Sequence, residues 1–277
     1  MNVNEARSQW ELAAPGWAKW EDVISAGATV ATEKMLIMAG ILDGSHVLDL
    51  ASGAGSQTLM AAKKAGLQGH VVANDISPTM LEHVEKNAQS KRISNVSTLL
   101  GAVQELAIAP NSFDAAICRF ALMLFSDPAI VLSNVYKILK PKGKISTIVF
   151  SAPTANEFFV KPMQILLRHA GKEPLAGGPG LFSLSVPAIL EKLFVDSGYV
   201  NVEIVKQDLT FKMPPSSEAL LMIQEAFGAY RAVISDCSQE VQKSAWEEVL
   251  DYLKSLETPQ GIEISAQVLI SSAQKPS

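Results

Sequence analysis

Residues 46–55 read His-Val-Leu-Asp-Leu-Ala-Ser-Gly-Ala-Gly, and this stretch decides the fold. Its apolar first half predicts a short buried strand with an acid, Asp49, near its end. Gly53 and Gly55 predict a tight turn that opens a helix, because a backbone without a Cβ adopts positive φ and lets a ligand approach closely. In a parallel sheet such a turn lies at the carboxyl edge of the strands, where nucleotide-sized ligands bind. The stretch therefore predicts an α/β protein with a ligand site at that edge.

The rest of the chain alternates between apolar, β-rich runs and helical patterns, which is typical of a parallel sheet covered by helices on both faces. The predicted strands are Val47–Ala51, His70–Ile76, Val96–Ala102, Ala115–Arg119, Lys144–Phe150, Val200–Phe211 and Gly261–Ala273. The predicted helices are Ser56–Ala65, Pro78–Ser90, Ala129–Leu139 and Val186–Ser197, with two helical stretches at Ser217–Ile234 and Gln239–Leu256. Seven strands whose last member returns after a long excursion predict a Rossmann-like sheet, with that strand antiparallel between the fifth and the sixth.

The composition is that of an ordinary globular protein. The 277 residues are 48% hydrophobic and 18% charged, with a formal net charge of −5. The 23 Lys and Arg are dispersed, so we expect no nucleic-acid partner. No apolar run approaches the roughly 20 residues of a membrane span, and Glu5 and Arg7 leave no apolar core for a signal peptide. Two cysteines cannot make a disulfide framework, which favours a cytoplasmic location.

The glycine turn distinguishes two kinds of nucleotide site. A dinucleotide-binding turn reads G-x-G-x-x-G, but counting from Gly53 places Thr58 where the third glycine belongs. Counting from Ala51 gives D-x-G-x-G-x-G with alanine for the first glycine, a modest departure provided that the backbone there keeps φ negative. Asp49 in this pattern suits a ligand that carries an ammonium group. A second acid, Asp75, follows the next strand, where a carboxylate can accept both hydroxyls of a ribose.

With these motifs the chain resembles the class I S-adenosylmethionine-dependent methyltransferases. It is most similar to the branch that includes the C-methyltransferases of ubiquinone and menaquinone biosynthesis. The resembling stretches are Trp10–Trp17, Val47–Gly55, Val71–Leu81, Leu106–Asp127 and Val135–Lys144. The resemblance covers residues 5–150 well and the rest loosely. It implies transfer of a methyl group from S-adenosylmethionine to a small apolar or aromatic metabolite, on carbon, nitrogen or oxygen.

The resemblance also implies which residues hold the cofactor. They are Asp49, Ala51, Gly53, Gly55, Asp75, Ile76, Ala102, Val103 and Arg119. Asp75 holds the ribose, Ile76 and Val103 contact adenine, and Arg119 lies near the methionine part and the acceptor. Family members have an acid at the position of Ala102, which receives the amino group of adenine. Losing such a hydrogen bond is worth roughly 1.5–3 kcal/mol, unless Gln104 or a backbone carbonyl substitutes.

Methyl transfer requires positioning and the exclusion of water, and for some acceptors also a base. The sequence leaves the catalytic residues unknown, and the candidates are His169, Tyr230 and Arg119. No C-x-x-C or paired-histidine motif indicates a metal site.

We expect one core domain with a cap. The ranges are 1–150 for an amino-terminal lid segment and the cofactor-binding half of the core, 151–186 for a cap insertion, 187–215 for core, 216–257 for a helical cap insertion, and 258–277 for the last core strand. The amino-terminal segment and both insertions would cover the carboxyl edge. Trp10, Trp17 and Trp20 share a face if a helix continues through Pro15, where they form a lid over an apolar acceptor or pack on the core.

Two other functions stay open. A protein that binds S-adenosylmethionine without catalysis would share these motifs, and Ala102 and the lack of an evident base are compatible with it. A nicotinamide-dependent oxidoreductase would share the sheet and the ribose acid, although the third glycine is missing. The expected partner is a small-molecule acceptor, with no integral membrane segment, and the sequence does not indicate an oligomeric state.

Overall fold

Residues 46–65 form the strand β1 (His46–Leu50), a turn and the helix α2 (Ser56–Ala65), as predicted. The computed structural model describes residues 3–173 and 178–277. The other strands are β2 (His70–Asp75), β3 (Val96–Leu100), β4 (Phe113–Arg119), β5 (Leu139–Phe150), β6 (Val200–Met213), β7 (Glu257–Thr258) and β8 (Gly261–Gln274). β1 to β5 pair in parallel, and β8 lies antiparallel between β5 and β6. The order β3-β2-β1-β4-β5-β8-β6 confirms the predicted sheet, and the short β7 pairs with β8.

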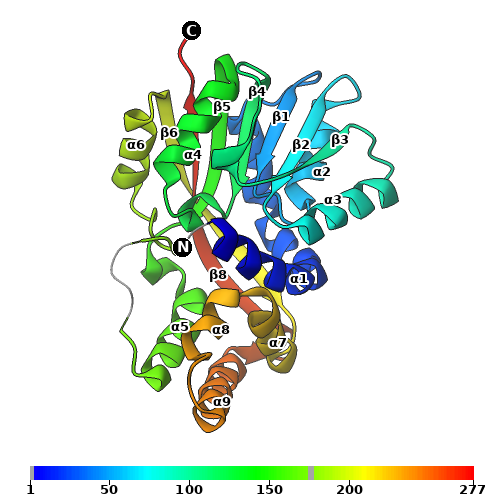
Figure 1. Ribbon diagram of the computed structural model, residues 1–277. Coiled ribbons are helices and arrows are strands. Elements are labelled where there is room, and N and C mark those ends of the chain that lie inside the picture. Colours follow the sequence, from blue (N-terminus) through cyan, green and yellow to red (C-terminus); the bar gives the residue numbers. More distant parts are fainter. Residues whose placement is uncertain (1–2, 174–177) are drawn as a thin grey trace.

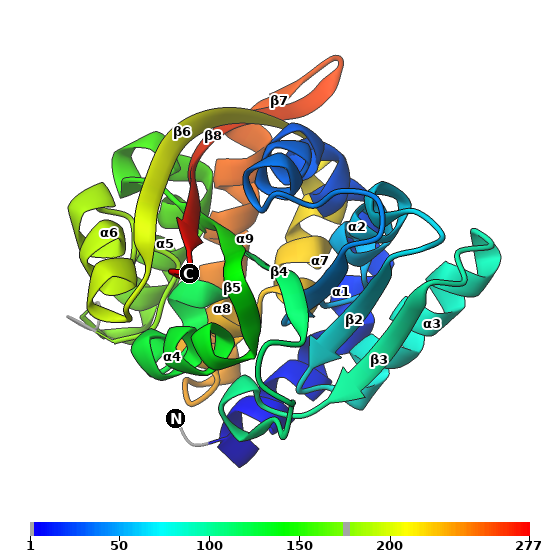
Figure 2. The ribbon, with the colours of Figure 1, turned by 90° about the horizontal axis from the view of Figure 1, so that it is seen from above.

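Besides α2, the described residues form eight more α-helices around this sheet. They are α1 (Val3–Met38), α3 (Pro78–Ser90), α4 (Pro128–Ile138), α5 (Glu157–Ala170), α6 (Pro187–Asp196), α7 (Ser216–Ala226), α8 (Gly228–Ile234) and α9 (Gln239–Ser255), with 3-10 turns η1 (Val103–Glu105), η2 (Leu122–Leu124) and η3 (Pro153–Ala155). α2 and α3 cover one face, and α4 and α6 cover the other (Figure 2). α3 begins where predicted because Ser77 Oγ accepts the N–H of Met80 at 3.1 Å, with Pro78 in the first turn.

The first helix is longer than the sequence suggests. α1 is 36 residues long and continues through Pro15, which removes one helical N–H donor. Packing on both sides holds the helix there: Ala13 and Ala14 are buried, and Gly16 lies so close to the backbone of Glu225 on α7 that a Cβ would not fit. The amino-terminal half of α1 crosses below the carboxyl edge of the sheet, and its second half packs on the sheet (Figure 1).

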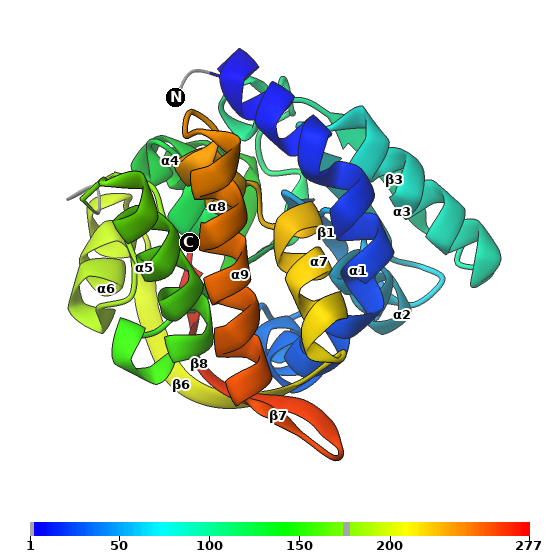
Figure 3. The same ribbon diagram turned by 90° about the horizontal axis from the view of Figure 1, so that it is seen from below.

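Four further helices gather below the sheet. α5, α7, α8 and α9 contact one another beside the extended ends of β6 and β8, next to α1 (Figure 3). The sequence did not predict α5, and the predicted helix at Ser217–Ile234 is two helices that meet at Phe227. Residues 174–177 of the predicted 151–186 insertion lie outside the described residues. The division of the chain into core and cap ranges stays a prediction.

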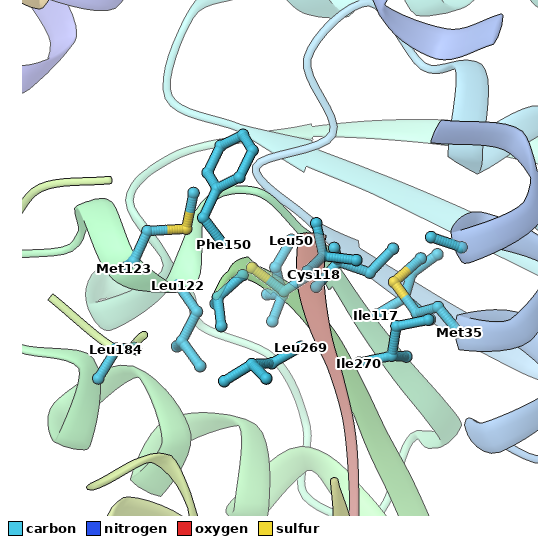
Figure 4. Close-up of a cluster of buried hydrophobic side chains, with 14 of the residues drawn as sticks. Met35, Leu50, Ile117, Cys118, Leu122, Met123, Phe150, Leu184, Leu269 and Ile270 are labelled. Carbon is cyan, nitrogen blue, oxygen red and sulfur yellow. The ribbon is translucent and has the colours of Figure 1, made fainter. Parts of the chain in front are cut away.

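The core lies on both faces of the sheet, with the second half of α1 on one face and α4 and α6 on the other. Met35 of α1, Leu50 of β1, Ile117 and Cys118 of β4 and Ile270 of β8 have no exposed surface, and Figure 4 shows them in one apolar cluster. Truncating such a Leu or Ile to Ala costs about 2–5 kcal/mol. Burial also raises the pKa of the Cys118 thiol to about 12, with the nearby Asp49 charge adding to it, so this cysteine is unreactive.

None of the described helices is both long and apolar enough to cross a membrane.

Candidate active site

A cavity of about 410 Å³ opens at the carboxyl ends of β1, β2, β3 and β4. This volume falls within the range of roughly 300–1,000 Å³ that small-molecule sites occupy. From the sheet side the wall consists of Ala51–Ala54, Gln57, Asn74–Ile76, Met80, Gly101–Gln104, Arg119–Ala121 and Leu124–Ser126. From α1 it consists of Val3, Ala6, Trp10, Trp17, Glu21, Ile24 and Ser25. The cavity is therefore built almost wholly from the strand ends and the first helix.

The insertions do not line the cavity within the described residues. No described residue after Ser126 belongs to its wall, and the coverage of the carboxyl edge by both insertions stays a prediction. α1 lies between the cavity and the helices α7 and α8: one side of it lines the cavity, and the other packs on these two helices. Trp10 and Trp17 line the cavity as the lid hypothesis expects, whereas the indole N–H of Trp20 donates to Glu225 Oε2 at 2.6 Å.

The turn after β1 has a left-handed backbone at three positions. Gly53 and Gly55 have φ values of 56° and 95°, which glycine adopts without strain. Ala51 has a φ of 50°, so the expectation of a negative φ at this alanine is wrong. A left-handed conformation costs a residue with a Cβ roughly 1–2 kcal/mol. Hydrogen bonds from neighbouring segments hold this turn: the Gly53 N–H donates to Asp75 Oδ2, and the Ser52 N–H donates to the Asn74 carbonyl.

Asp75 stands between the turn and the cavity. Its Oδ2 accepts the backbone N–H of Gly53 and its Oδ1 that of Ser77, both at 2.9 Å. Burial raises the pKa of this carboxyl group, and these backbone hydrogen bonds oppose the rise only in part. The backbone N–H of Ile76 acts on the same carboxylate, so three donors leave one of its roughly four lone-pair sites open. Asp75 therefore holds the glycine turn in place and can still accept a hydrogen bond from a ligand.

Asp49 and Gly55 lie behind the turn and are not part of the cavity wall. Asp49 is fully buried, and its carboxylate accepts the hydroxyl of Thr58 at 2.5 Å. Burial raises its pKa to about 7, although Thr58, Gln57 and the Arg119 charge act against the rise. Asp49 therefore fixes the first turn of α2, and a role in contact with the ligand stays a prediction.

Arg119 faces the cavity from the end of β4 without an acidic partner. Its guanidinium donates to Thr32 Oγ1 at 3.3 Å and to Ser56 Oγ at 2.5 Å, and Ser25 Oγ donates to the same Ser56 hydroxyl at 2.8 Å. Within the described residues, no carboxylate lies at ion-pair distance from it. Burial lowers the pKa of Arg119 against the attraction of Asp49 and Glu21. A cation held by hydroxyl groups at a cavity wall suits an anionic group of a ligand.

Four polar atoms in the wall lack a hydrogen-bond partner. In the described parts of the chain, the buried side-chain atoms without a partner are Trp17 Nε1, Ser52 Oγ, Asn74 Oδ1 and Gln104 Oε1. All four residues line this one cavity. Buried polar atoms are nearly always hydrogen-bonded in native proteins, so their concentration here indicates a ligand with several donors and acceptors. Asn74 was not predicted as a site residue, although a polar side chain inside an apolar strand is a local signal for one.

The remaining predicted residues divide between the cavity and the helices α5 and α8. Ile76, Ala102 and Val103 line the cavity beside Asp75. Of the catalytic candidates only Arg119 does so. His169 pairs with Glu248 of α9 at 2.8 Å, and the Tyr230 hydroxyl donates to the carbonyl of Phe159 at 2.7 Å.

The apolar end of the cavity follows Arg119. Phe120 has a φ of 57°, which is rare for a bulky side chain and marks strain of the kind found at functional sites. Its ring stacks on Phe150 with centroids 5.0 Å apart. Leu124 and Phe125 line the cavity as well. Among the described residues, no group of three or more His, Cys, Asp or Glu side chains is placed to hold a metal ion.

Known methyltransferases are similar to this chain in sequence. A family model described as a methyltransferase domain matches residues 41–170. A 2-phytyl-1,4-naphtoquinone methyltransferase from Nostoc sp. is 30% identical over 158 residues, which are 56% of this chain and 69% of that protein. An arsenite methyltransferase from Halobacterium salinarum is 28% identical over 172 residues, 61% of this chain. The chain spans 41% of the length of this second relative.

A solved structure extends the likeness of fold to most of the chain. The YcgJ protein from Bacillus subtilis superimposes with a TM-score of 0.60 at 19% identity, covering 90% of this chain and 99% of that one. The chain belongs to the class I S-adenosylmethionine-dependent methyltransferases. This membership confirms the resemblance seen in the sequence and argues against a nicotinamide-dependent oxidoreductase.

Proposed function

We propose that this protein transfers a methyl group from S-adenosylmethionine to a small apolar or aromatic metabolite. The observation that carries the proposal is the cavity itself, whose wall contains Asp75, Arg119 and the four unpartnered polar atoms of the described residues. A ligand with an amino-substituted base, a ribose and a zwitterionic tail offers hydrogen-bond donors, acceptors and a carboxylate to these groups. The residues present therefore fit this cofactor.

Each part of the cofactor has a place in the proposal. Asp75 holds the ribose, and Ile76 and Val103 hold the adenine ring between them at the ends of β2 and β3. The turn at Ala51 and Gly53 passes along the methionine part. Asp49 and Gly55 support that turn from behind.

Arg119 receives the carboxylate of the methionine part in this proposal. Its charge has no carboxylate partner within the described residues, and Ser56 and Thr32 aim the guanidinium at the wall. A bound carboxylate would supply the missing counter-charge, and charge-assisted hydrogen bonds of this kind are about twice as strong as neutral ones.

The acceptor occupies the apolar end. Phe120, Leu124 and Phe125 form its wall on the sheet side, and Trp10 forms it on α1. These side chains offer contact area and few hydrogen bonds, which favours an apolar or aromatic acceptor. Carbon, nitrogen and oxygen acceptors fit this wall equally.

The protein contributes orientation and exclusion of water to the reaction. When bound, S-adenosylmethionine supplies a methyl group on a positively charged sulfur, which is already activated for displacement. α1 covers the cavity and keeps water from the reacting groups, while the residues at the strand ends fix the orientation of the bound cofactor. Of the described lining residues only Glu21, Asp75 and Arg119 are ionisable, and each is engaged in hydrogen bonds inside the protein. The positions of His169 and Tyr230 give no support to either as a base.

Thermal unfolding with S-adenosylmethionine, S-adenosylhomocysteine, NAD and NADP tests the cofactor. A ligand at about 100 times its Kd stabilises by roughly 2.7 kcal/mol, a rise in Tm of about 5 °C for a chain of this size. We expect this rise with the two adenosyl compounds alone. A rise with a nicotinamide compound alone would contradict the proposal.

Incubation with S-adenosylmethionine and a panel of phenols, quinols, thiols and amines tests catalysis. We expect a methylated product, detected by mass spectrometry, from at least one apolar member. The alternative that the absence of a base leaves open is a binding protein without catalysis. Cofactor binding with no product from any acceptor would favour that alternative.

The proposal also covers the partners and the location of the protein. The net charge of −5 and the small cavity support a small-molecule acceptor and no nucleic-acid partner. A cytoplasmic location stays part of the proposal, and cell fractionation tests it.

A further inference from the structure

Gln104 stands out among the cavity residues. It lies in η1, directly after the buried Ala102 and Val103, and all three line the cavity. The Gln104 backbone carbonyl accepts the side-chain amide of Asn134 at 3.2 Å, which ties the turn to α4. Its side-chain oxygen Oε1 is buried, and the described residues offer it no donor. A fixed turn thus presents one free acceptor to the ligand.

The other free oxygens lie one or two strands away. Asn74 at the end of β2 donates its amide to the carbonyls of Leu99 at 2.8 Å and Gly101 at 2.9 Å, so its orientation is fixed. Ser52 after β1 donates its backbone N–H to the Asn74 carbonyl at 2.9 Å. Asn74 and Ser52 therefore belong with the strand ends next to the ribose acid Asp75. Gln104 belongs to the wall beyond β3.

In the wall beyond β3, Ala102 stands at a position where a hydrogen-bond acceptor could face the ligand. The Ala102 methyl group cannot accept a hydrogen bond, and Val103 offers only backbone atoms and an apolar surface. An exocyclic amino group placed against this wall would leave its N–H groups unpaired, unless the side chain two positions further on reaches it. Gln104 is the polar side chain that η1 places at this part of the wall.

We propose that Gln104 reads the base of the cofactor by accepting a hydrogen bond from the exocyclic amino group of adenine. This inference rests on the proposed function. It assigns to Gln104 a role in specificity, since a buried oxygen without a donor disfavours any base that lacks the amino group.

Isothermal titration with two ligands tests the inference. They are S-adenosylhomocysteine and its analogue in which hydrogen replaces the amino group at position 6 of the purine. We expect the protein to bind S-adenosylhomocysteine about tenfold more tightly than the analogue. In Gln104→Met, a change of similar size that removes the oxygen, we expect the two ligands to bind equally.

Two further variants separate recognition from damage to the turn. Gln104→Glu keeps an acceptor oxygen, so we expect it to retain the preference for the amino group. Glu105→Met changes an exposed neighbour in the same turn and serves as the matched control, with a preference equal to that of the parent protein. Thermal unfolding of each variant without ligand shows whether the fold is intact.

A retained tenfold preference in a folded Gln104→Met protein would overturn this inference and leave the proposed function standing. An equal loss of preference in Glu105→Met would also overturn it, because the effect would then belong to the turn as a whole. If the parent protein binds neither ligand, the proposed function fails together with the inference.

Discussion

A left-handed backbone at Ala51 stores strain beside the cavity. Replacing Ala51 by glycine relieves this strain, which raises the free energy of unfolding by roughly 1–2 kcal/mol. The greater conformational freedom of glycine in the unfolded chain lowers it again by about 0.4–1 kcal/mol. We expect Ala51→Gly to raise the free energy of unfolding by about 0.5–1 kcal/mol in urea denaturation. Ala54→Gly in the same turn, where φ is not positive, should lower it. A lower stability of Ala51→Gly would contradict the assigned backbone.

Asp49 makes stability depend on pH. Its pKa is raised to about 7 by burial, so the folded protein holds this proton in a range where the unfolded chain, with a carboxyl pKa near 3.8, has lost it. The stabilising effect of the proton is complete below about pH 4 and is lost as the pH rises toward 7. We expect Asp49→Asn, which keeps an oxygen for Thr58, to reduce this fall in the free energy of unfolding. Parallel pH profiles of the two proteins would show that Asp49 ionises normally.

Most of the predicted cofactor-binding residues line the site, because acids and glycines at strand ends are local signals. Ala51, Gly53, Asp75, Ile76 and the 102–103 pair all face the cavity. The Ala51 backbone was predicted wrongly, since the turn is held by contacts with the neighbouring strand, among them the Gly53 N–H that donates to Asp75 Oδ2. Such a contact has no signature in the local sequence.

Two carboxylates of α1 anchor this helix to the core. Glu11 accepts hydrogen bonds from Ser77 Oγ at 2.5 Å and from Thr79 at the beginning of α3. Glu21 accepts the backbone N–H of Ser56 at 2.8 Å at the beginning of α2. Both acids therefore lie at helix amino termini, where the peptide dipoles favour negative charge. Burial acts to raise the pKa of Glu11, but these hydrogen bonds outweigh it and lower the pKa below its usual value.

Glu11→Gln should loosen the amino-terminal half of α1. The amide keeps one acceptor oxygen but loses the charge, so part of the contact with α3 is lost. We expect faster amide hydrogen exchange in residues 3–20 than in the parent protein, with unchanged exchange in the sheet. Glu33→Gln, an exposed acid on the second half of the same helix, is the control. Equal exchange in all three proteins would show that Glu11 does not hold the helix.

Helices with an internal proline were the hardest elements to predict. α1 contains Pro15 and α5 contains Pro162, and in both a proline interrupts the helical hydrogen bonds. Packing maintains these helices: Phe158, Ile165 and Leu166 of α5 are buried in the core cluster. Propensity from the sequence cannot account for such tertiary contacts.

At the scale of the whole molecule, the arrangement of the sheet could be predicted from the order of the strands along the chain. Parallel strands joined by helices cross over with one handedness, which leaves few arrangements for the segments up to Phe150. The place of the insertions was not predictable in this way. Their apolar faces pack on α1 and on the ends of β6 and β8, and only the assembled molecule shows that α1 separates them from the cavity.

The central claim is that the cavity under the sheet binds S-adenosylmethionine through Asp75. Isothermal titration of S-adenosylhomocysteine into the parent protein and into Asp75→Ala tests it most directly. The account predicts one site per chain in the parent protein and at least a tenfold weaker site in the variant. It also predicts a loss of about 1–3 kcal/mol in the stability of Asp75→Ala, because the N–H groups of Gly53 and Ser77 lose their acceptor. Equal affinity in the two proteins, or no binding by the parent, would contradict it.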